Sequence, residues 1–293
     1  MSRFGTVHLA QQEQAVTGES PLWDDTRNVL WWIDIQGRRL LGLHTETGPL
    51  TPLALPSEPG LIALAENGSL VIGLEDGLWL LQPESARLTP LTPVPSQYPN
   101  MRLNDGKPDR QGRLWFGSMD KSGSGAPTGA LYCRHPGGRL DIVRHAVCIP
   151  NGITISPDGK TLYFTDSPTQ ALLAFDLDQR TGQLGNERIF HAFSGLDKPD
   201  GATVDSEGGV WIAVVHGARL DHFNAGGSLI ESIALPVAKP TMCIFGGEKL
   251  DDLYVTSQRR FLTTEQLTEQ PLTGALLRIG TSSRGLAAAR LHL

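Results

Sequence analysis

Hydrophobic and polar positions alternate along residues 198–214, and one turn interrupts the alternation. The segment reads KPDGATVDSEGGVWIAV. Its alternating part leads into a polar turn at residues 205–209, and the β-rich run 210–214 follows directly. Alternation, a turn and then a run of branched and aromatic residues predict two antiparallel strands joined by a hairpin.

This hairpin pattern recurs along the chain. Residues 18–34, 102–118 and 149–167 read GESPLWDDTRNVLWWID, RLNDGKPDRQGRLWFGS and IPNGITISPDGKTLYFTDS. The β-rich run of the repeat occurs six times, roughly 40 to 48 residues apart, at residues 30–34, 70–74, 114–118, 162–166, 210–214 and 253–257. Further β-like segments follow most copies, at residues 39–44, 77–81, 130–134 and 172–178. The pattern predicts an all-β fold, a six-bladed β-propeller with four-stranded antiparallel blades around a central channel.

The remaining local patterns agree with an all-β fold. Residues 265–270 alone are expected to form a short helical turn, before Pro271. The β-like residues 6–10 are expected to pair with residues 274–279 in the last blade, because pairing the two chain ends would remove open sheet edges. No linker or low-complexity tract divides the chain, so we expect residues 1–293 to form a single propeller domain.

Composition narrows the function classes. A net charge of −6 without a basic run argues against nucleic acid or an anionic membrane as a partner. Three cysteines are too few for a disulfide framework and favour a reducing compartment. No N-terminal apolar region or transmembrane run is present. We therefore expect a cytoplasmic protein without membrane contact, as a monomer or small homo-oligomer.

Polar residues recur at matching positions, roughly ten to twelve residues before the β-rich run. Four repeats have them, as Glu19-Ser20, Asn104-Asp105, Asn151-Gly152 and Asp200-Gly201. The other two repeats have small or apolar residues there, around Gly60-Leu61 and Met242-Cys243. Rotation about the propeller axis relates equivalent positions of different blades, so these side chains are expected to converge at one mouth of the channel.

A cluster of carboxylate and amide oxygens suits one divalent cation, and the residues leave Ca²⁺, Mg²⁺, Mn²⁺, Zn²⁺ and Fe²⁺ open. Asp-Gly and Asn-Gly are also common turn dipeptides, which is the competing interpretation. Each of the four repeats already has a separate turn downstream, so the upstream pairs are not needed for the hairpins. Arg102 precedes Asn104 at the expected mouth, where it would bind a ligand or form a solvated ion pair.

The motifs GESPLWDD, RLNDGKPDRQGRLWFGSM, PNGITISPDGKTLYFTDS, KPDGATVDSEGGVWIAV and PTMCIFGGEKLDDLYVTS resemble the gluconolactonase/regucalcin (senescence marker protein 30) family, in order and from about residue 18 to residue 280. The resemblance implies a six-bladed propeller and a divalent-metal sugar lactonase. By motif position, Glu19, Asn151 and Asp200 match the family's metal ligands, and Asp200 also matches the residue assigned as general base. Arg102 and Asn104 match residues that contact the lactone.

One departure affects the substrate. Asp120-Lys121 follows Gly117-Ser118-Met119, where animal members have a glutamate that contacts the sugar. The resemblance therefore assigns Asp120 to the substrate contacts, but it does not carry over the identity of the sugar.

The expected activity is hydrolysis of an aldonolactone, such as gluconolactone or a pentonolactone, to the open-chain acid. A metal would polarise the lactone carbonyl, and Asp200 would take a proton from the attacking water. Two alternatives remain: an organophosphate or aryl-ester hydrolase on the same scaffold, and a non-enzymatic propeller that binds calcium or protein.

Overall fold

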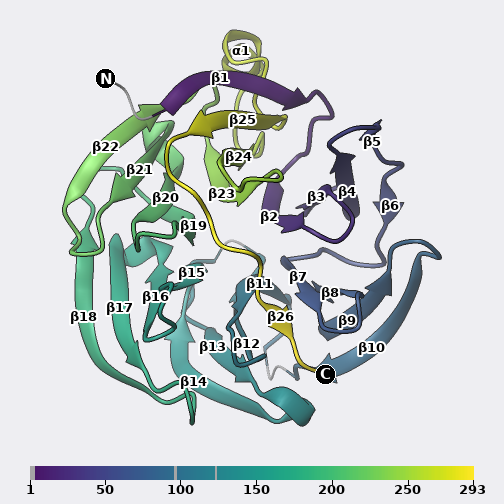
Figure 1. Cartoon of the computed structure of the whole chain (residues 1–293), viewed down its shortest axis with the longest axis vertical. Coiled ribbons are helices and arrows are strands. Elements are labelled where there is room, and N and C mark those ends of the chain that lie inside the picture. The colour runs from purple at the N-terminus through teal and green to yellow at the C-terminus, as the bar shows by residue number, and fades with distance from the viewer. Residues whose placement is uncertain (1–3, 96–97, 123) are drawn as a thin grey trace.

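Six antiparallel sheets stand in a ring in the computed structural model, which describes residues 4–95, 98–122 and 124–293 (Figure 1). The innermost strands of the six blades are β2 (Gly18–Asp24), β7 (Leu61–Ala65), β11 (Met101–Pro108), β15 (Pro150–Ile155), β19 (Pro199–Val204) and β23 (Pro240–Gly246). The second strands are β3 (Val29–Asp34), β8 (Leu70–Gly73), β12 (Leu114–Asp120), β16 (Thr161–Asp166), β20 (Val210–Val214) and β24 (Asp252–Ser257). These second strands are the β-rich runs of the repeat, and the predicted six-bladed propeller is confirmed.

The outer half of each blade is more exposed. The third strands are β4 (Arg39–His44), β9 (Gly77–Gln82), β13 (Gly129–Arg134), β17 (Ala171–Leu177), β21 (Arg219–Phe223) and β25 (Leu276–Thr281). The outermost strands are the short β5 (Gly48–Pro49) and β6 (Leu53–Ala54), then β10 (Arg87–Pro93), β14 (Leu140–Val147), β18 (Leu184–Ala192), β22 (Leu229–Ala234) and β1 (Phe4–Gln11). Inner strands such as β2 and β19 are buried along their whole length, whereas β18 and β22 are largely exposed.

The N-terminal strand completes the sixth blade. Strand β1 pairs antiparallel with β25, with His8 opposite Arg278 and Leu9 opposite Leu277. The N-terminal strand thus supplies the outer strand of a blade whose other three strands come from residues 240–281. The predicted pairing of the chain ends is confirmed, and it joins the first and last parts of the chain in one sheet.

Regular helix is confined to one short segment within the described residues. Helix α1 (Thr264–Glu269) begins at a capping box, in which Thr263 Oγ1 accepts from the Gln266 amide (3.3 Å) and Gln266 Oε1 accepts from the Thr263 amide (2.9 Å). Single 3₁₀ turns lie at Pro136–Gly138, Ser167–Thr169 and Val215–Gly217. Over the described ranges, no helix is long and apolar enough to cross a lipid bilayer.

The hydrophobic core lies in the seams between neighbouring blades. One cluster joins Trp31 and Ile33 of the first blade to Leu64 and Ile72 of the second. Five further clusters fill the other seams in the same way. Because each blade packs on both neighbours, burial of apolar area holds the inner strands at fixed angles around the axis.

Buried aspartates at the inner hairpin turns pin three blades. Each accepts a hydrogen bond from the indole of a tryptophan on the next strand: Trp31 to Asp24 (3.4 Å), Trp115 to Asp109 (2.9 Å) and Trp211 to Asp205 (3.0 Å). These turns are the downstream turns of the repeat, so they need nothing from the polar residues upstream. The upstream polar residues are therefore not required to form the hairpins, and they can serve a functional site.

A C-terminal segment crosses one mouth of the ring. After β25 the chain passes over the channel to β26 (Arg290–Leu291), which pairs in parallel with β7 of the second blade (Figure 1). The carbonyl of Arg284 accepts from the Ser206 amide (2.7 Å), and the carbonyl of His292 accepts from Arg134 Nη1 (2.9 Å). The crossing leaves the opposite mouth, at the N-terminal ends of the inner strands, for a site.

Candidate active site

Five of the six predicted site residues line one cavity, of about 330 Å³, at the uncrossed mouth. Each comes from the first half of an inner strand: Glu19 from β2, Arg102 and Asn104 from β11, Asn151 from β15 and Asp200 from β19. All five are buried. The structure therefore brings together side chains that lie as far as 181 residues apart in the sequence (200 − 19).

Asp120 lies outside the lining of this cavity. It ends β12, and its carboxylate accepts hydrogen bonds from the Ser122 amide (2.8 Å) and the Ser122 hydroxyl (2.6 Å) as well as from Ser124. These bonds lower the pKa of Asp120. They bind the carboxylate to its own loop, and a substrate contact by Asp120 stays a prediction.

Irregular strand pairing aims the polar side chains into the cavity. The register of the inner hairpin shifts directly after Glu19, Asn104 and Asn151. Such a bulge bends the strand and redirects the side chains beside it. The residue after each has a left-handed backbone, with φ of 49° at Ser20, 35° at Asp105 and 62° at Gly152.

Two of these left-handed residues also connect neighbouring blades. Ser20 Oγ accepts from the amide of Ile62 in the second blade (2.9 Å), and Asp105 Oδ2 accepts from the amide of Ile153 in the fourth blade (2.9 Å). Non-glycine residues adopt this conformation at a cost, which the bonds across the seam offset. The bulge and the bond together fix the inner strands just below the cavity.

A chain of hydrogen bonds orients the two amides of the site. Arg102 Nη1 donates to Asn104 Oδ1 (2.6 Å), and Asn104 Nδ2 donates to Asn151 Oδ1 (2.8 Å). Asn151 Nδ2 then donates to Ser167 Oγ (2.8 Å), whose hydroxyl donates to the carbonyl of Pro199 (2.7 Å). The chain ends beside Asp200 and leaves a lone pair on Asn151 Oδ1, because a carbonyl oxygen has two. We call these four side chains the amide relay: Arg102, Asn104, Asn151 and Ser167.

The two carboxylates of the site repel one another. Burial, with the charge of Asp105, raises the pKa of Glu19 to about 8 against the opposing charge of Arg102. Burial and the charges of Glu19 and Asp105 raise the pKa of Asp200 well above its ordinary value. Burial lowers the pKa of Arg102 to about 10, so its guanidinium stays charged at neutral pH. The positive charge of Arg102 therefore does not fully compensate the two buried carboxylates, Glu19 and Asp200.

The donor set fits a hard divalent cation. Carboxylate oxygens of Glu19 and Asp200 and the amide oxygen of Asn151 are ligands that Ca²⁺, Mg²⁺ and Mn²⁺ prefer. Among the described residues no three His, Cys, Asp or Glu side chains converge as a metal site, so a cation here depends on the amide as well as the two carboxylates. A doubly charged ion would stabilise the ionised form of both carboxylates against the burial and the neighbouring negative charges that raise their pKa values.

Several residues of the cavity were missed by the sequence reasoning, among them Ser167, Lys198 and Lys239. Ser167 follows β16 and ends the amide relay, outside the stretch that was compared between repeats. Lys198 and Lys239 also line the cavity, and each directly precedes the proline that opens β19 or β23. A comparison of the repeats two positions upstream of the polar residue would have found the lysines.

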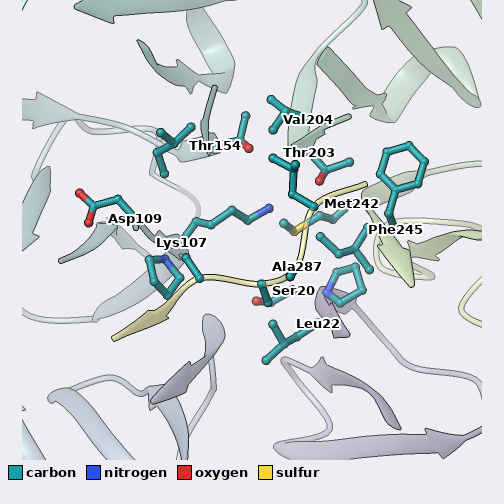
Figure 2. Close-up of a pocket in the computed structure, with 18 of the residues that line it drawn as sticks. Ser20, Leu22, Lys107, Asp109, Thr154, Thr203, Val204, Met242, Phe245 and Ala287 are labelled. Atoms are coloured by element: carbon teal, nitrogen blue, oxygen red, sulfur yellow. The ribbon is translucent and has the colours of Figure 1, made fainter. Parts of the chain in front are cut away.

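A second cavity, of about 100 Å³, lies under the C-terminal segment at the other mouth. Figure 2 shows Lys107 pointing into it from β11, between Thr154 and Thr203 and above Ala287. The carboxylate of Asp109 at its edge is bound to Arg113 Nε (2.6 Å) and to the Trp115 indole. This cavity lacks a carboxylate pair, so we place the chemistry at the mouth lined by Glu19 and Asp200.

Known proteins resemble the chain over nearly its whole length. Residues 17–259 match the family described as SMP-30/Gluconolactonase/LRE-like region. A 6-deoxy-6-sulfogluconolactonase of Pseudomonas putida is 33% identical over 96% of this chain and 97% of its own. Regucalcin of Gallus gallus is 34% identical over 92% of each chain. The crystal structure of regucalcin, a calcium-binding protein from Agrobacterium tumefaciens, has a TM-score of 0.93 at 29% identity and covers 99% of this chain and 98% of its own.

Proposed function

The chain belongs to the SMP-30/gluconolactonase/LRE-like family, and we propose that it hydrolyses the lactone of a sugar acid to the open-chain acid. The supporting observation is the cavity of about 330 Å³ in which a buried carboxylate pair faces a buried arginine and two oriented amides. The relative from Pseudomonas putida, named for a sugar lactone, supports the reaction class.

We propose Glu19, Asn151 and Asp200 as the residues that hold one divalent cation. When bound, such a cation acts as a Lewis acid toward the lactone carbonyl oxygen. The amide relay presents Asn151 Oδ1 rather than its NH₂ group, because that NH₂ group is bound to Ser167. Glu19 Oε2 accepts from the Ser20 amide (2.6 Å), which holds the carboxylate at the wall of the cavity.

Asp200 is the proposed general base. Among the described residues no side chain donates a hydrogen bond to its carboxylate, and Arg102 acts on it only as a nearby charge. The backbone amide of Gly201 is its donor, and the remaining lone pairs of the carboxylate are free to accept a proton from a water beside the lactone. Burial holds its pKa above that of an exposed aspartate, which brings its basicity toward the pH at which the reaction runs.

Arg102 and Asn104 are proposed to bind the ring. The Arg102 guanidinium uses Nη1 for Leu103 O (2.9 Å) and Asn104, and its Nε lies 3.8 Å from Glu58 Oε2. Among the residues that the structure describes, none accepts from its Nη2, which remains available to a carbonyl or hydroxyl oxygen of the substrate. A ring held in this way presents one face of its carbonyl to the water at Asp200, which removes much of the entropic barrier.

The test is acid release from a panel of aldonolactones in a weakly buffered pH indicator, with chelator-treated protein and with each divalent cation restored. Hydrolysis of at least one lactone, lost on chelation and restored by a cation, is expected. Glu19→Gln should abolish the restoration, whereas Glu207→Gln, which changes an exposed acid in the fifth blade, should not. Faster hydrolysis of paraoxon or an aryl ester than of every lactone would refute the proposal in favour of the other hydrolase class.

A further inference from the structure

A repeated cation marks the cavity wall. Arg102, Lys198 and Lys239 each directly precede the inner-strand residue that pairs with the last residue of the β-rich run: Leu103 opposite Ser118, Pro199 opposite Val214 and Pro240 opposite Ser257. All three cations line the cavity of about 330 Å³. Rotation about the axis relates the three positions, so the third, fifth and sixth blades each direct a cation to the same mouth.

The arginine is balanced and the lysines are not. Arg102 pairs with Glu58 and feels the charges of Glu19 and Asp200. Among the described residues no carboxylate lies within ion-pair distance of Lys198 or Lys239. Asp197, the neighbour of Lys198, is bound to Arg219 through two hydrogen bonds (3.1 and 2.7 Å).

Both lysines line the same wall as His216. The pKa of His216 is lowered first by burial and then by the charges of Lys239 and Lys198, against the opposing charge of Asp197. Lys239 is half-buried, and among the described residues its Nζ donates to the backbone oxygens of Arg260 (3.3 Å) and Phe261 (3.5 Å) and lies 5.6 Å from the centre of the Phe261 ring. Two ammonium groups that crowd one imidazole form a region of unbalanced positive charge on the fifth and sixth blades.

The rest of the cavity does not supply the missing negative charge. A divalent cation would match Glu19 and Asp200, and Glu58 matches Arg102. The two lysines then leave the cavity with an excess of two positive charges, which a neutral sugar does not offset. A neighbouring hollow of about 240 Å³ shares Lys198 and His216 with the cavity, so a substituent that extends past the ring has room.

We propose that the substrate is a sugar lactone with an anionic group, a sulfonate, phosphate or carboxylate, at the end of the sugar remote from the lactone carbonyl, and that Lys198 and Lys239 bind this group. The inference rests on the proposed lactone hydrolysis and adds its substrate class. Ammonium groups bind oxyanions through short, charge-assisted hydrogen bonds. They also attract an anionic substrate to the mouth before it docks.

The experiment compares D-glucono-1,5-lactone with gluconolactones that have a 6-sulfonate or a 6-phosphate and with a lactone of glucaric acid, all at one ionic strength. The quantity measured is the ratio of kcat/KM for each anionic lactone to kcat/KM for the neutral one. We expect the unmodified protein to prefer at least one anionic lactone by about tenfold, the scale of one ion pair to the exposed Lys198 and one to the half-buried Lys239. The three anionic lactones show which oxyanion fits.

Lys198→Gln and Lys239→Gln remove the charge and keep a polar side chain that is one atom shorter. Each should lower the preference by about three- to tenfold and leave kcat/KM for gluconolactone within about threefold. Lys249→Gln is the matched control, because Lys249 is an exposed lysine that follows β23 at the far end of the strand. Added salt should reduce the preference of the unmodified protein and have a smaller effect on both cavity variants.

The outcomes separate the two proposals. Hydrolysis of gluconolactone without preference for any anionic lactone, or a preference that both cavity variants retain, would overturn the substrate class and leave lactone hydrolysis intact. Failure to hydrolyse any of the lactones would overturn lactone hydrolysis, and the substrate class with it.

Discussion

Ser167 tests whether the amide relay prepares the cation site. Its hydroxyl accepts from Asn151 Nδ2 (2.8 Å) and donates to the carbonyl of Pro199 (2.7 Å), and the residue is buried. Ser167→Ala removes both bonds and leaves the Asn151 NH₂ group without its acceptor. The bond from Asn104 Nδ2 to Asn151 Oδ1 (2.8 Å) is then the one relay bond left to hold the amide oxygen toward the cation.

The expected cost follows from that lost acceptor. A buried donor without a partner costs about 1–3 kcal/mol. At about 1.4 kcal/mol for each tenfold change, this range corresponds to roughly 5- to 150-fold in the Kd of the cation. Ser167 touches neither Asp200 nor Arg102 through its side chain, so kcat at saturating cation should remain within about threefold.

The assay is calorimetric titration of chelator-treated protein with the cation that restores activity, together with lactone kinetics at saturating cation. Ser118→Ala is the control, since Ser118 is also a buried serine with two hydrogen-bond partners, Tyr132 Oη (3.4 Å) and the Ala130 amide (3.2 Å), outside the relay. A Kd for Ser167→Ala within twofold of the unmodified protein would refute the reasoning. Equal weakening in both variants would also refute it, because the effect would then reflect general destabilisation.

Three other changes separate chemistry, binding and folding. Asp200→Asn should lower kcat by roughly 10²–10⁴-fold at saturating cation in a folded protein, and a rate within a few fold of normal would move the base to Glu19. Arg102→Ala should raise KM for the lactone, at a cost of about 1.5–3 kcal/mol, with the cation Kd nearly unchanged; loss of the cation instead would contradict the role. Asp205→Ala should lower the free energy of unfolding in urea by about 3–5 kcal/mol, because the Trp211 indole and His222 lose their buried acceptor. Burial raises the pKa of Asp205, but the hydrogen bonds from His222 and Trp211 outweigh burial and lower it. The contribution of Asp205 to the free energy of unfolding is therefore present above about pH 4 and lost below it. A difference in stability between the two proteins that does not narrow below about pH 4 would contradict this.

The propeller was predictable because each blade repeats the same local sequence pattern. A turn and a β-rich run recur in every blade, and the hairpin they form is local in sequence. Pairing of β1 with β25 was predictable for a different reason, since an unpaired edge on either strand would be unfavourable. The crossing of the channel by the C-terminal segment was not predictable, because two parallel-paired residues and a few backbone bonds to loops leave no periodic pattern.

The convergence of Glu19, Asn104, Asn151 and Asp200 at one cavity followed from rotational symmetry alone. The hydrogen bonds between them did not, because they depend on bulges that the alternation of residue types does not reveal. Ser167 comes from the end of a second strand, so comparison of the inner strands passes over it.

Lys198 and Lys239 show that comparing one further position of each repeat identifies additional residues of the cavity. In the inner strands, the polar residue faces the centre of the cavity, and the residue two places earlier stands at its rim. The central position carries oxygen donors in four blades, and the rim position carries a cation in three. Chemistry common to lactone hydrolysis needs only the central set, since the carbonyl and the water meet there. In the proposed binding mode Arg102 holds the ring, and Lys198 and Lys239 contact the group that the ring carries, so a change at either lysine should alter the preferred lactone without disturbing the carboxylate pair.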